Sequence, residues 1–144
     1  MLERYETGTI DRRQLIQALA AVAVTAQAAP AASTFKGVSI NHIALRVTDI
    51  PRSRDFYQKH FGMPVIREAE SNCFLGLGAN FLTLFKNANA GLDHFCLSID
   101  NFKPEPVMDE LKRQSLTPRR QEDRVYFPDP GGLTVQVSAV NHRA

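Results

Sequence analysis

The 144-residue sequence has few cysteines, little net charge and no long apolar run. Cys73 and Cys96 allow at most one disulfide, and their spacing does not show whether they pair, so either could instead be a small buried side chain. The formal net charge is only +2, and the one basic cluster has no aromatic stripe beside it, which argues against nucleic-acid binding. The longest apolar stretch is about half the ~20 residues that a membrane span needs.

The rest of the composition is that of a globular protein. Hydrophobic residues make up 44% of the chain and charged residues 22%, which is ordinary for a folded domain. A chain of this length can bury a substantial core in a single domain. We therefore expect one domain, preceded by a segment of different character.

That segment is residues 1–34. A charged start containing Arg12 and Arg13 leads into an Ala-rich apolar run at residues 17–29, and small residues two apart precede Pro30. This order predicts an export signal of the twin-arginine type, and hence a periplasmic or extracellular protein. The alternative is an Ala-rich helix that stays in the folded chain. The globular domain would then be residues 35–144.

An internal repeat organises this domain. Residues 41–47 (NHIALRV) align with residues 93–99 (DHFCLSI), 52 positions further on, and both stretches alternate apolar and other residues. Such a period of two predicts a strand with one buried face. The repeat places His42 and His94 at equivalent positions, on the face away from the core.

Each half continues in the same order of elements. Module one, residues 38–89, is predicted to hold a strand at 39–47, a helix from Asp49 to Gly62, and strands at 64–68, 73–77 and 81–86. Module two, residues 90–140, is predicted to hold a strand at 91–99, a helix from Pro104 to about Thr117, and strands at 119–122, 124–127 and 133–138. The fold class is α+β: two βαβββ modules with mixed, mostly antiparallel sheets, helices outside, and inner faces that enclose a cup.

The paired modules, the repeated histidine and a closing FPDPGGLTVQ motif at residues 127–136 resemble the vicinal oxygen chelate superfamily. That superfamily includes glyoxalase I, the bleomycin- and fosfomycin-resistance proteins and the extradiol dioxygenases. The resemblance extends over about residues 38–140. It implies the cup-shaped fold, and it implies a homodimer whose cup forms either within one chain or between swapped modules.

The resemblance also implies a divalent metal ion (Fe, Zn, Ni or Mn) held by the first and last strands of both modules. His42 and His94 match the first-strand ligands. Gln136 stands where the family usually has Glu, and Leu82 falls near the fourth position. A neutral amide and a hydrocarbon leave the charge of the ion uncompensated, so we expect a degenerate, weakened site. The alternative is a hydrogen-bonded pair of cavity histidines without metal. His60 and His142 are expected to be structural or solvated.

Side chains alternate between the two faces of a strand, and this alternation predicts the other residues that line the cup. The ligand-binding candidates are Arg46, Leu82, Leu84, Cys96, Ser98, Tyr126 (or Phe127 in the other register) and Thr134. This lining suits a small organic molecule, aromatic or acidic, with Arg46 either pairing with its carboxylate or exposed at the rim.

Three functions are compatible with these residues. The first is a metal-dependent enzyme of the glyoxalase or dioxygenase kind, in which the ion binds neighbouring oxygens of a substrate. The second is a metal-free protein that binds and sequesters a ligand, as bleomycin-resistance proteins do. The third uses Cys96 as a nucleophile beside His94, although no third group orients the pair.

Overall fold

The structure, a computed structural model, describes residues 8, 11, 13–14 and 32–144. The chain divides into two units, Met1–Thr34 and Phe35–Ala144. Most of the predicted export signal lies outside the described residues. Within the described part of the chain, no helix is both long enough and apolar enough to cross a membrane.

Both modules have the predicted order of elements. Module one contains β1 (Gly37–Val47), α3 (Ile50–Phe61), β2 (Val65–Ala69), β3 (Asn72–Leu77) and β4 (Asn80–Lys86). Module two contains β5 (Gly91–Ile99), α4 (Pro104–Arg113), β6 (Arg119–Gln121), β7 (Arg124–Pro128) and β8 (Thr134–Ser138). The clearest difference from the prediction is α4, which ends before Thr117 because the chain turns at Ser115, a residue with a positive φ of 62°.

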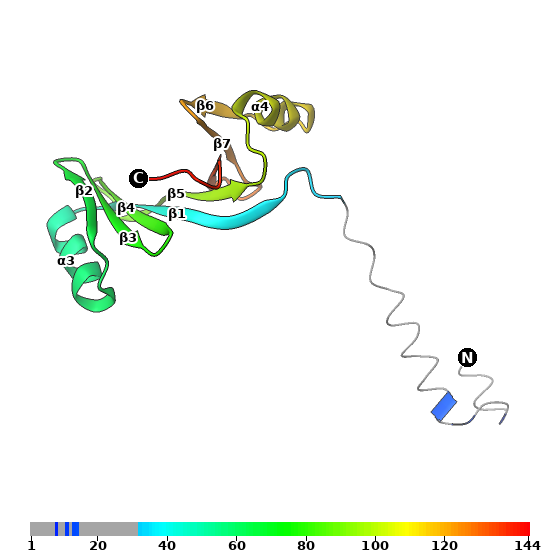
Figure 1. The fold of residues 1–144 in the computed structure, drawn as a ribbon, viewed down its shortest axis with the longest axis horizontal. Coiled ribbons are helices and arrows are strands. Elements are labelled where there is room, and N and C mark those ends of the chain that lie inside the picture. The colour runs from blue at the N-terminus through cyan, green and yellow to red at the C-terminus, as the bar shows by residue number, and fades with distance from the viewer. Residues whose placement is uncertain (1–7, 9–10, 12, 15–31) are drawn as a thin grey trace. The chain divides into compact units, whose positions relative to one another are not determined.

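The two modules share one sheet. Its eight strands lie in the order β2-β3-β4-β1-β5-β8-β7-β6, with β1 and β5 antiparallel at its centre. Figure 1 shows β1 and β5 side by side between the two modules. The pairs β1–β4 and β5–β8 are parallel, and the other pairs are antiparallel. The modules are therefore joined edge to edge through the two repeated strands, and these strands bring the two halves of the cup together.

Two apolar clusters hold the helices against one face of the sheet. The first consists of Val47, Ile50, Met63, Cys73, Leu75 and Leu84, and the second of Ile99, Val107, Leu111, Val125, Val135 and Val137. Ile50 and Val107 come from α3 and α4, so each helix covers its own module. Because side chains alternate along a strand, the opposite face of the sheet is left for the cup.

Local sequence determines where α3 begins and ends. The Asp49 carboxylate accepts a hydrogen bond from the Arg52 backbone N–H at 2.9 Å, and Pro51 stands in the first turn. Gly62 ends the helix with a left-handed φ of 64°, which glycine adopts without steric cost.

We expect Asp49→Ala to lower the free energy of unfolding by about 1 kcal/mol, the usual cost of losing an N-cap. Urea unfolding followed by circular dichroism measures the change. Asp109→Ala, which removes an exposed carboxylate within α4, is the matched control and should cost less than about 0.5 kcal/mol. Equal effects of the two substitutions would contradict the capping role.

Candidate functional site

Both modules of this one chain line the cup, a cavity of about 720 Å³ on the sheet face opposite the helices. Its wall in module one is largely aromatic, with Phe74 on β3 and Phe81 and Phe85 on β4. Tyr126 on β7 lies on the module-two side, and its ring meets that of His94 edge-on, with centroids 5.5 Å apart. The volume is of the size that proteins use for small organic ligands.

His42 and His94 converge in this cup. Both rings are buried, and their Nε2 atoms lie 3.2 Å apart, one from each central strand. The outer ring nitrogens are held by the preceding residues: Nδ1 of His42 lies 2.9 Å from Asn41 Oδ1, and Nδ1 of His94 lies 2.7 Å from Asp93 Oδ1. The repeat therefore supplies an orienting oxygen as well as an imidazole in each half.

These contacts determine the tautomers of both rings. Asn41 donates its Nδ2 to the carbonyl of His142 at 3.2 Å, so its Oδ1 faces His42 and accepts from Nδ1–H. The Asp93 carboxylate can only accept, so Nδ1 of His94 also carries its hydrogen. While both rings are neutral, each Nε2 presents a lone pair to the other. A proton or a metal ion between the two nitrogens removes the repulsion.

Gln136 brings a further oxygen to this place. Its side chain is fully buried, and its Nε2 donates to Cys96 Sγ at 3.2 Å across the β5–β8 pair. Its Oε1 is buried without a hydrogen-bond partner. An orphaned buried acceptor is costly, and a metal ion is one partner that would satisfy it. Together with the paired Nε2 atoms, this oxygen fits a divalent ion.

The protonation of His42 agrees with a ligand role. Burial, followed by the neighbouring His94 and His142, lowers the pKa of His42 from 6.5 to about 3, and an interaction with Gln136 opposes that shift. The ring is therefore neutral at physiological pH, as a metal-binding imidazole must be.

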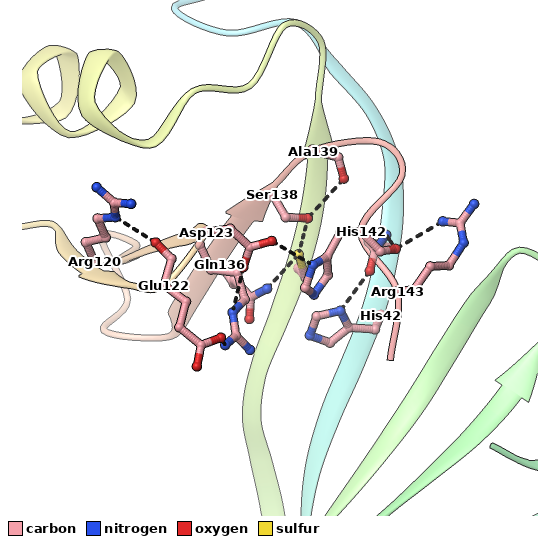
Figure 2. Close-up of polar contacts among 12 residues, drawn as sticks. His42, Arg120, Glu122, Asp123, Gln136, Ser138, Ala139, His142 and Arg143 are labelled. Atoms are coloured by element: carbon pink, nitrogen blue, oxygen red, sulfur yellow. Dashed lines mark hydrogen bonds and ion pairs between the residues drawn. The ribbon is translucent and has the colours of Figure 1, made fainter. Parts of the chain in front are cut away.

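His142 is a cup residue that the sequence analysis treated as structural or solvated. The C-terminal tail turns back over the sheet (red in Figure 1) and places this ring 5.9 Å from that of His42, between centroids. Its Nδ1 lies 3.7 Å from Asp123 Oδ2 (Figure 2). Burial lowers the pKa of His142 although Asp123 opposes the shift. No periodic pattern marks the tail, so only the folded chain reveals this contact.

The prediction of which β4 side chains point into the cup is wrong by one residue. Leu84 is buried in the first apolar cluster and Leu82 packs against it, whereas Thr83 lines the cup. The strand register explains the difference, because Ala44 faces Thr83 and Cys96, 52 residues after Ala44, faces Gln136. Thr83 is therefore the module-one counterpart of Gln136. A slip of one residue moves every side chain of a strand to the other face.

The remaining predicted residues divide between the cup and its surroundings. Tyr126 lines the cup and Phe127 packs against the second apolar cluster, which settles that alternative. Ser98 is buried, and its hydroxyl has no partner and does not reach the cavity. Arg46 and Thr134 lie at positions of the predicted cup face of their strands, yet neither lines the cup. The Arg46 guanidinium instead lies beside the backbone of Gly91.

The cysteines are both buried and free. Cys96 Sγ lies 3.2 Å from Ser138 Oγ and accepts a hydrogen bond from Gln136, so it supports the floor of the cup without lining the cavity. Burial raises the pKa of Cys96 to about 11, although both hydrogen bonds lower it. A buried neutral thiol is a poor nucleophile, which argues against the Cys96–His94 alternative.

Among the described residues, no group of three or more His, Cys, Asp or Glu side chains is placed to hold a metal ion. A site at the cup floor would therefore consist of two imidazoles and the Gln136 amide. These are the three ligand candidates that the resemblance implied, and Thr83 rather than Leu82 lines the cup from β4.

Comparison with known proteins finds one matching family and several solved structures of similar fold. A sequence model of the glyoxalase/bleomycin resistance protein/dioxygenase superfamily matches residues 39–99. An extradiol ring-cleaving dioxygenase from B. fuscum is 22% identical with a TM-score of 0.66, over 76% of this chain and 34% of that one. Homoprotocatechuate 2,3-dioxygenase from Brevibacterium fuscum, complexed with 3,4-dihydroxyphenylacetate, is 23% identical with a TM-score of 0.63, over 76% of this chain and 39% of that one.

The chain thus spans little more than a third of the length of these dioxygenases, and at this identity the likeness concerns the fold. The α+β fold is similar to that of these dioxygenases. The predicted resemblance to the glyoxalase, bleomycin-resistance and dioxygenase proteins is confirmed by the family match over residues 39–99 and by this structural likeness.

Proposed function

We propose that the protein is a divalent-metal-dependent enzyme of the glyoxalase or dioxygenase kind, in which His42, His94 and Gln136 hold the ion. The observation that carries this proposal is the 3.2 Å separation of the two Nε2 atoms, with both Nδ1 atoms engaged elsewhere. A metal ion between these two nitrogens would be bound by both of them. The orphaned Oε1 of Gln136 supports the same assignment.

When bound, the ion would supply Lewis-acid chemistry at neighbouring oxygens of a substrate. The chain itself performs the other tasks. Asn41 and Asp93 fix the direction of the imidazoles, as outer hydrogen-bond partners of metal ligands do. Because the three proposed ligands are neutral, the ion would favour a substrate with anionic oxygens. The aromatic wall of Phe74, Phe81 and Phe85 shields that place from water.

Metal content tests the proposal. The purified protein, offered Fe(II), Zn, Ni and Mn in turn and then dialysed, should retain about one equivalent of one of these ions. The double variant His42→Ala, His94→Ala should retain less than a tenth of that amount, with an unchanged far-UV circular dichroism spectrum. His60→Ala removes an exposed imidazole from α3 and should bind like the parent. Equal metal content in the parent and the double variant would refute the site.

A second candidate is a metal-free binding protein of the bleomycin-resistance kind. The specific observation in its favour is the floor itself, where the module-one position is Thr83 and the module-two position is the amide of Gln136. Neither residue supplies the charge that holds a divalent ion tightly. Binding of a small ligand by a parent protein that retains none of the four metals would favour this function.

A further inference from the structure

Two arginines line the cup in the same unusual way. The guanidinium of Arg67 on β2 lies over the ring of Phe74, 4.1 Å from its centroid. The guanidinium of Arg119 on β6 lies over the ring of Tyr126, 4.0 Å from its centroid. In each case the arginine stands directly across from its aromatic partner in an antiparallel pair of strands.

These two pairs are copies of each other. Arg119 follows Arg67 by 52 residues and Tyr126 follows Phe74 by 52, the same spacing that separates His94 from His42. Their strands, β2 and β6, are the two outer edges of the eight-stranded sheet. The fold therefore places one stacked guanidinium at each outer edge of the sheet that forms the cup, with the histidine pair on the two central strands between them.

Neither arginine has a carboxylate partner within 4 Å among the described residues. The acids that line the cup are engaged elsewhere: Asp93 holds His94, while Glu122 and Asp123 pair with Arg124. Stacking occupies a face of each guanidinium and leaves its in-plane N–H groups free to donate. Arg67 and Arg119 are thus cations of the cup that have no carboxylate partner and are already oriented by their rings.

We propose that the ligands of this cup are small aromatic carboxylates, and that Arg67 and Arg119 select them by binding the acid group. The inference rests on the proposed function insofar as the cup is the ligand site. The aromatic wall of Phe81 and Phe85 favours a planar ring, and the two guanidinium groups favour an anionic substituent on it. This assigns to Arg67 and Arg119 the role that the sequence analysis gave to Arg46.

A matched pair of probes tests the selection. We would measure binding of 3,4-dihydroxyphenylacetate and of the neutral 4-methylcatechol by calorimetry, in metal-loaded and in chelator-treated protein. The parent should bind the acid about tenfold more tightly than the neutral probe in both states, and added salt should reduce that preference. In the double variant Arg67→Gln, Arg119→Gln the preference should fall to within about twofold, while affinity for 4-methylcatechol stays unchanged.

Arg52→Gln removes an exposed guanidinium from α3, outside the cup, and should retain the full preference. Equal binding of the two probes by the parent, or no binding of the acid, would overturn the inference. So would a preference that survives in the double variant. Because the preference is measured with and without metal, a cup that selects acids but retains no ion would refute the proposed enzyme alone. A cup that retains the ion without preferring the acid would refute this inference alone.

Discussion

Gln136→Glu should tighten metal binding by at least about tenfold, because it places an anionic oxygen where the neutral Oε1 now lies without a partner. The same change should destabilise the metal-free protein, since it buries a carboxylate and removes the hydrogen bond to Cys96. The metal-induced rise in Tm should therefore be larger in the variant than in the parent. These two opposite effects are the signature of an oxygen that faces the ion.

Competition with a chelator gives the metal affinity, and thermal unfolding with and without metal gives the two values of Tm. Gln121→Glu is the matched control, because it makes the same chemical change at an exposed position on β6 that lines the cup away from the central strands. It should leave the metal affinity within about twofold of the parent. An unchanged or weaker affinity in Gln136→Glu would mean that Gln136 does not face the ion.

Leu84→Ala should lower the free energy of unfolding by about 3 kcal/mol, within the range for deleting most of a fully buried leucine. Leu84 is fully buried between β4 and α3 in the first apolar cluster, so the truncated side chain leaves a cavity. The variant should nevertheless retain the parent's metal stoichiometry below its unfolding transition, since Leu84 points away from the cup.

Urea unfolding of the metal-free protein measures this loss. Leu77→Ala is the control, because Leu77 is 58% exposed at the end of β3 and should cost less than about 1 kcal/mol. A loss below about 1 kcal/mol in Leu84→Ala would contradict the core position. Loss of metal with stability intact would instead support the cup-lining role that the sequence analysis assigned to this residue.

The repeated strands were predictable because their pattern is local. Alternation over residues 41–47 and 93–99 identifies two half-buried strands, and the repeat identifies the equivalent histidines. The start of α3 at Asp49 and its end at Gly62 were predictable for the same reason, since caps are chemical features of a few consecutive residues.

The β4 strand shows where local reasoning fails. Residues 81–86 (FLTLFK) are apolar at most positions, so the two faces of the strand are alike in hydrophobicity and parity is ambiguous. Pairing with β1 resolves the ambiguity by placing Thr83 beside Ala44. Arg67 and Arg119 were missed for a related reason: each lies on a short edge strand whose neighbours show no clear alternation.

The sequence by itself determined the two-module plan and the equivalence of His42 and His94. Those features follow from periodicity and repetition, which a linear chain records directly, whereas Gln136 became a ligand candidate only through the resemblance to a known family. Only the tertiary structure decided that Thr83 lines the cup and Leu82 does not, and that His142 enters it. It also decided that the arginines of the cup wall include Arg67 and Arg119 and exclude Arg46. These depend on strand register and on the path of the tail, and both are selected by long-range contacts between residues far apart in the chain.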